Sequence, residues 1–242
     1  MRPGLSISSR LRWPFIRDAL QRFQPASVVE VGCGRGALIK FLADQREYRG
    51  YEPDSLSFGV ARSMALHRAD VDVLNTPLPE ISDRQFDALV AFEVLEHLAS
   101  DGAALKTWSE WVVDGGLLII SVPAHSDRFG PSDVRAGHFR RYERQELARL
   151  LRSAGFEPLE IYSWGMPLGY LLEAVRNTVA RRTAAGMSIE ERTATSGRWL
   201  QVPASLSWLI GTLIWPFMWL QQPFRHTGLG IGFVAVARRS GS

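Results

Sequence analysis

Cysteine and lysine are almost absent from this chain, and each absence narrows the kind of protein it can be. Cys33 is the one cysteine among 242 residues, which excludes an internal disulfide and favours a reducing cytoplasm as the setting. The 28 basic residues include only two lysines, Lys40 and Lys106, and we interpret the arginine excess as genome composition rather than nucleic-acid binding. Residues 1–24 lack the uninterrupted apolar run of a signal peptide. At 46% hydrophobic and 22% charged, the composition fits one α/β enzyme domain with additions.

A glycine-rich turn is the most informative feature that the sequence does contain. Residues 28–36 read as a buried strand carrying an acid, Glu30, followed by three glycines at alternate positions. Glycine allows a sharp turn and a close approach of the backbone to a ligand. A helix predicted over residues 37–42 would point its free N–H groups at that ligand. The segment therefore predicts a nucleotide-cofactor loop.

The rest of the chain alternates between strand and helix patterns. Strands are expected near residues 27–31, 48–52, 86–92, 117–122, 157–163 and 232–237. Asp114–Gly116 would form the turn before the strand near 117–122, here called the fifth, and Ala154–Phe156 would close the helix before the strand near 157–163, here called the sixth. This alternation predicts a mostly parallel sheet with helices on both faces, whose ligands bind beyond the carboxyl ends of the strands. The residues expected around that crevice are Glu30, Glu52, Glu93 and Pro123.

Three ordered segments, Glu30–Gly36, Gly50–Asp54 and Phe86–Leu98, resemble the class I S-adenosylmethionine-dependent methyltransferases. The resemblance implies a doubly wound, Rossmann-like, seven-stranded sheet. It also implies S-adenosyl-L-methionine as the methyl donor and S-adenosyl-L-homocysteine as the product. An NAD(P)-dependent oxidoreductase is the first alternative, because the glycine spacing and the position of Glu52 would also suit a dinucleotide. A noncatalytic, membrane-associated module that keeps the cofactor fold is the second.

The resemblance assigns roles to the acidic residues at the strand ends. Glu30 would hold the methionine portion of the donor through the loop, and Glu52 would accept both ribose hydroxyls. Asp72 would bind the adenine amine while Val73 covers the ring, with Asp70 as the alternative by register. The full set predicted to contact the cofactor is Glu30, Gly32, Cys33, Gly34, Gly36, Glu52, Pro53, Asp72, Val73, Phe92 and Glu93.

Histidines, arginines and a tyrosine concentrate after the fifth predicted strand. The pattern over residues 137–142 resembles a subgroup of bacterial small-molecule methyltransferases in which this loop lies over the cofactor. We expect His138 to be the general base, with His125 as the alternative and with Arg141 and Tyr142 as orienting groups. The competing interpretation is that His138 and Tyr142 only order the loop.

Glu93, Glu96 and His97 form a second group of polar residues. They could coordinate a divalent cation that activates a catechol-like acceptor, as the resemblance to quinone-biosynthesis O-methyltransferases suggests. The same pattern occurs in metal-free relatives, where it caps the following helix and contacts the cofactor. We predict no metal here and leave this alternative open.

A long insertion separates the sixth and last predicted strands. The expected organisation is an N-terminal helical cover over residues 1–24, a core over 25–164, the insertion over 165–230 and the last strand with its tail over 231–242. The insertion contains a helical pattern over 167–182, a polar stretch over 183–197 and a tryptophan-rich segment without charges over 199–224. Its apolar centre of 16 residues is shorter than the roughly 20 that a membrane span needs.

The insertion is expected to carry acceptor specificity. It could roof the acceptor pocket, form a homodimer interface, or lie in a membrane interface. The predicted reaction is methyl transfer to an oxygen, less favourably a nitrogen or carbon, of a hydrophobic small molecule, lipid or secondary metabolite. We expect no nucleic-acid partner and a cytoplasmic location that allows peripheral membrane contact.

Overall fold

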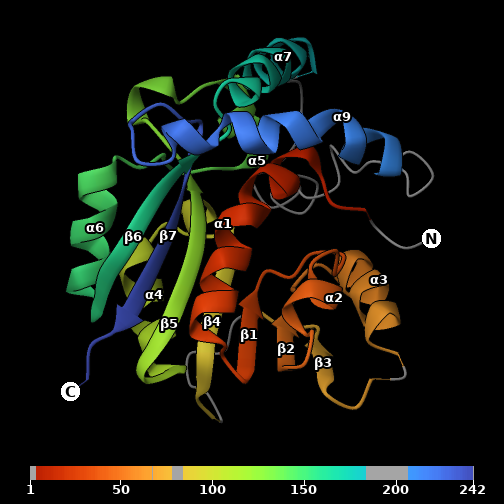
Figure 1. The fold of residues 1–242 in the computed structure, drawn as a ribbon, viewed down its shortest axis with the longest axis vertical. Helices are drawn as coiled ribbons and strands as arrows, with labels where there is room; N and C mark the ends of the chain where they lie inside the picture. The colour runs from red at the N-terminus through yellow and green to blue at the C-terminus, as the bar shows by residue number, and fades with distance from the viewer. Residues whose placement is uncertain (1–3, 67, 78–83, 184–206, 242) are drawn as a thin grey trace.

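A seven-stranded sheet lies at the centre of the computed structural model, which describes residues 4–66, 68–77, 84–183 and 207–241. The strands are β1 (Ser27–Val31), β2 (Glu47–Tyr51), β3 (Val71–Leu74), β4 (Phe86–Phe92), β5 (Val112–Pro123), β6 (Phe156–Trp164) and β7 (Gly232–Arg239). They lie in the order β3-β2-β1-β4-β5-β7-β6, and neighbours are parallel except that β7 runs antiparallel to β5 and β6. The predicted α/β, Rossmann-like class is confirmed (Figure 1).

Helices cover both faces of the sheet. The α-helices are α1 (Ile7–Phe23), α2 (Ile39–Leu42), α3 (Ser55–Ala65), α4 (Asp101–Glu110), α5 (Pro131–Ala136), α6 (Arg144–Ser153), α7 (Leu168–Thr183) and α9 (Ser207–Leu220). Short 3-10 turns are η1 (Leu95–His97), η2 (Ser126–Arg128) and η4 (Gln222–Phe224). One core cluster joins α1, α2 and α3 to the sheet, and a second joins α4 and α6 to its other face.

Strand β1 shows how the sequence positions the site. Val28 packs in the first core cluster, whereas Val29 and Val31 pack in the second, because side chains alternate between the faces of a strand. A central parallel strand is buried on both faces and therefore reads as a continuous apolar run. Glu30 is the exception in this run, with only 3% of its surface exposed. A carboxyl group buried at this position requires a local reason.

Helix α1 runs along the sheet in front of the strands in Figure 1. Its first turn is capped by Ser6, whose Oγ accepts a hydrogen bond of 3.1 Å from the backbone N–H of Ser9. Phe15 and Leu20 are buried on the side of α1 that packs in the first core cluster. The helix also contacts α9, so residues from opposite ends of the chain meet on this side of the molecule.

The described part of the insertion consists of α7, α9 and η4. Gln221, directly after α9, is fully buried and fixes this helix to two other elements. Its Nε2 donates to the carbonyl of Leu11 at 2.8 Å, and its Oε1 accepts from the N–H of Gly165 at 3.0 Å. Figure 1 shows α9 lying across one end of the sheet. Among the described residues, none of the helices is both long and apolar enough to span a membrane.

Three details of the secondary structure differ from the sequence prediction. Strand β3 was not anticipated as a separate element, because four residues carry too little periodicity. Strand β5 begins at Val112, whereas the prediction started it after Asp114–Gly116. Its pairing with β4 shifts register near this turn, where Gly115 has φ +75°. The strand therefore continues through the predicted turn as an irregular segment. The histidine-rich loop contains the short helix α5. Most of the polar stretch 183–197 lies outside the described residues.

Candidate active site

The glycine loop lies between β1 and α2, at the carboxyl end of β1. Its three glycines, Gly32, Gly34 and Gly36, all have positive φ, which a side chain would strain. A Cβ at Gly36 would lie 3.0 Å from Cα of Ala61, so this glycine lets α3 pack closely. A Cβ at Gly34 would meet no atom within 4 Å. The backbone at Gly34 is therefore open to a ligand.

Glu52 follows β2 directly and joins this loop to the neighbouring strand. It is 7% exposed, and its Oε2 accepts from the N–H of Gly34 at 2.8 Å while its Oε1 accepts from the N–H of Asp54 at 2.9 Å. Each carboxylate oxygen has a second lone pair, so Glu52 can accept from a diol and still hold the loop. Pro53 is exposed beside it. The predicted ribose contact and the shape of the glycine loop thus depend on the same side chain.

Glu30 has a partner that explains its burial. The hydroxyl of Tyr48 donates to Glu30 Oε2 at 2.6 Å, and glycine is needed at position 50 because a Cβ there would lie 2.7 Å from that hydroxyl oxygen. Burial raises the pKa of Glu30 to about 8, and the charge of Glu52 adds to the increase although the Tyr48 hydrogen bond opposes it. Burial also raises the pKa of the Cys33 thiol, which suits a small packed side chain rather than a nucleophile.

The prediction that Asp72 and Val73 form the adenine site does not fit the structure. Asp72 lies within β3 opposite Arg49 and pairs with it at 3.7 Å, while Val73 is buried in the core. The alternative, Asp70, precedes β3 and pairs with Arg68, so it lies at the opposite end of the strand. An error of three residues in locating the end of a four-residue strand produced this assignment.

Asn75 occupies the position that the prediction required. It follows the last residue of β3, and its Nδ2 donates to the carbonyl oxygens of Glu52 at 2.9 Å and Pro53 at 3.2 Å. Its Oδ1 accepts from the hydroxyl of Ser55 at 3.0 Å. A carboxamide at the carboxyl end of β3, beside Glu52, is a candidate partner for an adenine amine. The sequence signal for it was a polar residue directly after a short β-branched run.

Glu93 lies at the carboxyl end of β4, next to the predicted contact Phe92, which is 9% exposed. Its backbone has φ +57°, an uncommon conformation for a non-glycine residue. Arg12 of α1 approaches Glu93 Oε1 at 2.6 Å, and Ser121 Oγ donates to the same oxygen at 3.0 Å. Burial alone would raise the pKa of Glu93, but the charge of Arg12 and the cations near it hold the pKa below its usual range. Helix α1 therefore reaches the site through Arg12, which sequence patterns did not single out.

His138 follows α5 and is held by an aspartate from that helix. Its Nδ1 lies 2.9 Å from Asp133 Oδ1, and its Nε2 lies 3.8 Å from Glu96 Oε1. The side chain is 13% exposed. The His138 hydrogen bond and Arg141 outweigh the effect of burial and lower the pKa of Asp133 to about 2, so Asp133 remains a carboxylate. This geometry presents one imidazole nitrogen to Asp133 and leaves the other available for proton transfer.

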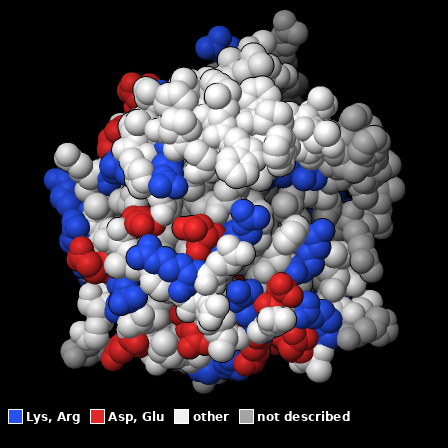
Figure 2. Space-filling model, in the orientation of Figure 1, with Lys and Arg blue, Asp and Glu red and all other residues white. Residues whose placement is uncertain are grey.

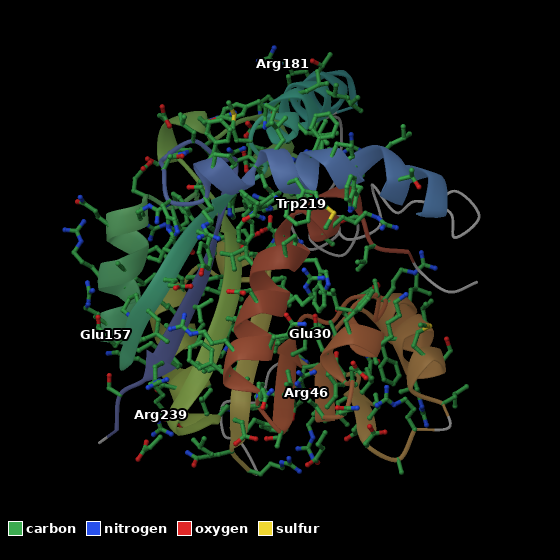
Figure 3. All side chains as sticks on the ribbon, in the orientation of Figure 1. Glu30, Arg46, Glu157, Arg181, Trp219 and Arg239 are labelled. Atoms are coloured by element: carbon green, nitrogen blue, oxygen red, sulfur yellow. The ribbon has the colours of Figure 1, made fainter. Side chains whose placement is uncertain are left out.

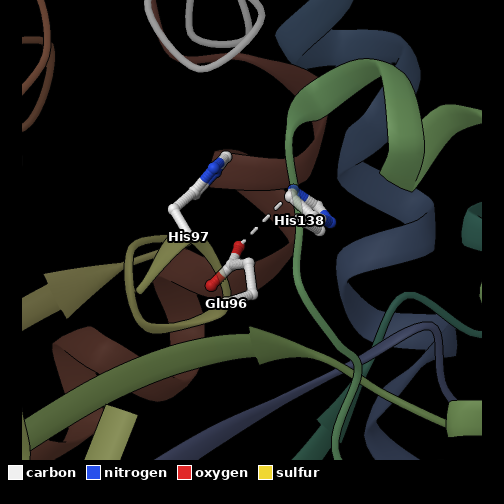
Figure 4. Close-up of side chains that lie close together, drawn as sticks. All are labelled: Glu96, His97 and His138. Carbon is white, nitrogen blue, oxygen red and sulfur yellow. Dashed lines mark ion pairs between the residues drawn. The ribbon is translucent and has the colours of Figure 1, made fainter. Parts of the chain in front are cut away.

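Glu96 and His97 lie beside this imidazole (Figure 4). The rings of His97 and His138 meet edge to face with centroids 4.7 Å apart. Neither oxygen of the Glu96 carboxyl group has a hydrogen-bond partner, and the side chain is fully buried. Burial and the charge of Glu93 raise the pKa of Glu96 well above its usual value, while burial and His138 lower the pKa of His97 to about 4. The raised pKa favours the protonated form of Glu96, and His97 is neutral near pH 7.

The same three side chains are close enough to hold a metal ion, with donor atoms within 4.8 Å of one another. From the sequence, Glu93, Glu96 and His97 were considered as metal ligands. The cluster in the structure contains Glu96 and His97 but has His138 in place of Glu93. Metal binding would require Glu96 in its carboxylate form.

Arg141 and Tyr142 anchor the loop that carries His138. Arg141 is 5% exposed and binds both oxygens of Asp133, with Nη2 to Oδ2 at 2.7 Å, and it also reaches Glu173 of α7 at 2.5 Å. Tyr142 is fully buried and donates to Asp101 Oδ2 at 3.0 Å. Both side chains hold the loop in place. They can therefore orient His138 only indirectly, through Asp133 or through the loop backbone.

His125 lies on the other side of the same loop. Its backbone has φ +66°, and its Nδ1 is 3.6 Å from Glu143 Oε2. Its ring packs edge to face on Phe233, and its Nε2 has no hydrogen-bond partner. With Asp127 and Glu143 it forms a second group of possible metal donors, although both acids are exposed. His125 is less enclosed by partners than His138.

An acid-lined glycine loop at the carboxyl ends of parallel strands, with β7 antiparallel in a seven-stranded sheet, defines the Rossmann-like class that binds S-adenosylmethionine. A family model described as a methyltransferase domain matches residues 9–161, more than half of the chain. The chain therefore belongs to the methyltransferase domain family. This finding confirms the predicted family. It also excludes the alternative that the core belongs to an NAD(P)-dependent oxidoreductase family.

Similar proteins agree with this assignment. A protein of Mycolicibacterium smegmatis named as a probable S-adenosylmethionine-dependent methyltransferase is 30% identical over 137 residues, which cover 54% of this chain and 51% of the relative. The ubiquinone biosynthesis O-methyltransferase of Alkalilimnicola ehrlichii is 28% identical over 116 residues, with 46% and 47% covered. The chain thus spans about half the length of the curated relatives it matches.

One solved structure shows the same fold with ligands bound. It is the Burkholderia thailandensis 1,6-didemethyltoxoflavin-N1-methyltransferase with bound 1,6-didemethyltoxoflavin and S-adenosylhomocysteine. The TM-score is 0.57 at 18% identity, and the comparison covers 94% of this chain and 77% of that chain. At this identity the likeness establishes the fold alone.

Proposed function

We propose that this protein transfers a methyl group from S-adenosylmethionine to an oxygen atom of a hydrophobic small molecule. One observation carries the proposal: the open backbone of Gly34, held by Glu52, lies at the same end of the sheet as the His138–Asp133 pair. When bound, the donor supplies a methyl group on a sulfonium that leaves as a neutral thioether. The protein then has to bind, align and remove one proton from the acceptor.

The donor fits the residues of the first half of the site. Glu52 would accept the ribose hydroxyls, Asn75 the adenine amine, and Glu30 would favour the ammonium of the methionine portion. A pyrophosphate would be repelled by the Glu52 carboxylate at the loop, whereas a cationic donor is attracted. The remaining predicted contacts at the loop and strand ends, Gly32, Cys33, Gly36, Pro53, Phe92 and Glu93, stay part of this proposal.

His138 would remove the acceptor's proton. Its Nδ1 donates to Asp133, which fixes the tautomer and stabilises the imidazolium that forms. The acceptor oxygen forms its bond to the methyl carbon as the carbon–sulfur bond breaks, and the hydroxyl proton passes to Nε2 of His138. Glu96 lies 3.8 Å from that nitrogen, and burial raises the pKa of its carboxyl group. The family's curated relatives include an O-methyltransferase, which supports oxygen as the acceptor atom.

The test of this proposal is a direct assay of the methylated atom. The protein is incubated with labelled S-adenosylmethionine and with matched pairs of hydrophobic acceptors that differ only in carrying a hydroxyl or an amine. We expect labelled methyl ethers and stoichiometric S-adenosylhomocysteine by mass spectrometry. Exclusive methylation of the amines would contradict oxygen as the acceptor, and a sustained loss of turnover after chelation would restore the metal alternative.

The first prediction concerns Glu52. Replacing Glu52 by alanine removes a carboxylate that serves both the ribose and the N–H of Gly34, so we expect S-adenosylhomocysteine binding to weaken at least about tenfold. Calorimetric titration measures this change. Glu47→Ala, an exposed glutamate of the same strand, is the matched control and should leave the dissociation constant unchanged. Equal affinities for the Glu52 variant and the wild type would refute the ribose assignment.

The second prediction follows from the raised pKa of Glu30. Because Glu30 keeps its proton below about pH 8, a ligand ammonium that favours the carboxylate must displace that proton. Affinity for S-adenosylhomocysteine should therefore rise with pH, by up to about tenfold per unit below pH 8. Glu30→Gln cannot ionise and should remove this part of the pH dependence. The same slope in both proteins would show that Glu30 does not face the ammonium.

A further inference from the structure

Helix α9 is apolar around its whole circumference, yet the described part of the chain covers only one side of it. Its covered side carries Ile214, which is 4% exposed, with Phe217 and Met218 packed against the core. Its other side exposes Leu213 at 63%, Trp215 at 60%, Pro216, Trp219 at 65% and Leu220 at 51%. A helix that is hydrophobic all round is normally buried on all sides. The exposed side of α9 therefore requires a partner.

Exposed arginines lie at the ends of α7 and α9. Arg225 lies beyond the end of α9 and is exposed, and Arg181 is exposed near the end of α7. Figure 3 labels Arg181 and Trp219 on these two helices, and Figure 2 shows that the surface over α9 is almost free of charged side chains. The one acid of α7, Glu173, is buried and paired with Arg141 and Arg128. The exposed charge directly after α9 and η4 is therefore the positive charge of Arg225.

We propose that this face, made of the exposed side of α9 together with Arg225 beyond its end, docks on the surface of a lipid bilayer with anionic headgroups. An amphipathic helix in a membrane interface buries its apolar side about 5–10 Å deep, with aromatic rings near the headgroups and basic residues facing anionic lipids. Trp215 and Trp219 lie one helical turn apart, with ring centroids 6.3 Å apart. A free interfacial helix exposes a polar side to water. In α9 the side that faces away from the proposed membrane surface is instead buried against the protein.

The charge pattern favours a membrane over a second copy of this chain. Pairing two copies through this face would bring no acid to meet Arg225, since a two-fold interface uses the same patch twice and α9 contains no acidic residue. Exposed Arg225 follows α9 and contributes positive charge at this end of the face. An anionic lipid surface neutralises that charge.

The docking face is connected to the candidate active site. Helix α7 contributes Glu173 to Arg141, and Arg141 holds the Asp133 that binds His138. Helix α9 is fixed through Gln221 to α1, whose Arg12 reaches Glu93. A docked enzyme would therefore present its site close to the bilayer, where a hydrophobic acceptor dissolves. This last step rests on the proposed function, whereas the docking itself does not.

Vesicle sedimentation of the full chain tests the docking. Vesicles are made of phosphatidylcholine alone or with phosphatidylglycerol, and the donor and acceptor are absent. We expect the protein to sediment with the anionic vesicles, to be released by salt, and to have its tryptophan fluorescence quenched by brominated lipids. Leu213→Glu/Trp219→Glu should weaken partition at least about tenfold, because two charges enter the face that must dehydrate.

Matched controls separate docking from folding. Leu66→Glu changes an equally exposed leucine after α3 and should not alter partition, and Arg62→Glu on α3 should have less effect than Arg225→Glu. We expect Arg225→Glu to weaken partition at least about fivefold on anionic vesicles only. All variants should retain S-adenosylhomocysteine binding, which reports a folded core.

Three outcomes would overturn the proposal. They are absence of the wild type from anionic vesicles, equal partition of the wild type and the double variant, and a wild-type dimer that the double variant breaks without any vesicle binding. The third outcome would assign the face to a second copy of the chain. Because no methyl transfer takes place in this assay, its failure leaves the proposed reaction intact, and a failed acceptor assay leaves the docking result intact.

Discussion

Replacing His138 by alanine is expected to lower turnover about a hundredfold to ten-thousandfold while S-adenosylhomocysteine binds with unchanged affinity. The reason is geometric: Asp133 fixes one nitrogen of the ring at 2.9 Å, and the other nitrogen is left to take a proton. The donor contacts of Glu52 and Gly34 belong to other elements of the site. Single-turnover kinetics with a hydroxylated acceptor measure the change, and calorimetry measures the affinity.

A second variant distinguishes a base from a structural side chain. Glutamine at position 138 can still donate to Asp133, so it should preserve the loop, yet it cannot accept a proton at neutral pH. We therefore expect His138→Gln to fold as the wild type does and to stay slow, and we expect it to lose the ionisation seen in the pH dependence of turnover. Rescue of turnover by glutamine would show that His138 only orders the loop. A loss confined to His125→Ala would transfer the role of base to His125.

The fold could be predicted because its signals are local. Strand β1 was located to the residue, since a central parallel strand reads as a continuous apolar run that ends in a glycine turn. The end of helix α6 was also located to the residue by its closing Ala154–Phe156 segment, where Gly155 has φ +85°. The short β3 carried no such signal, and Asp72, which was expected beyond a strand end, lies within β3 while Asn75 follows it.

The candidate site could be predicted only where its residues lie next to a strand end. Glu30, Glu52 and Glu93 satisfy that condition, and all three lie where the topology requires. The partners of His138 and Arg141 do not, because Glu96 reaches His138 and Glu173 reaches Arg141 from segments distant in sequence, through the packing of the loop and α7. Single-sequence patterns contain no information on such long-range ion pairs. The role of Arg141 as the centre of a buried network was therefore missed.

Replacing Arg141 by leucine is expected to reduce the free energy of unfolding by about 3–5 kcal/mol, because it leaves buried carboxylates without their cation. Arg141 binds both oxygens of Asp133 and reaches Glu173, and all three side chains are at most 5% exposed. Urea unfolding at pH 7, followed by tryptophan fluorescence, measures the loss. Arg152→Leu is the matched control: it removes an exposed pair with Glu157 and should cost less than about 1 kcal/mol.

The pH dependence of this loss identifies its source. The pKa of Asp133 is lowered from 3.8 to about 2 in the folded protein, so its ionised form stabilises the fold above pH 3.8 and this contribution is lost as the pH falls through about 2. Without Arg141 the folded-state pKa of Asp133 must rise, which removes that contribution. The difference between wild type and Arg141→Leu should therefore shrink as the pH falls from about 4 toward about 2. A difference that stays constant over this range would show that Arg141 stabilises the loop by packing rather than by its charge.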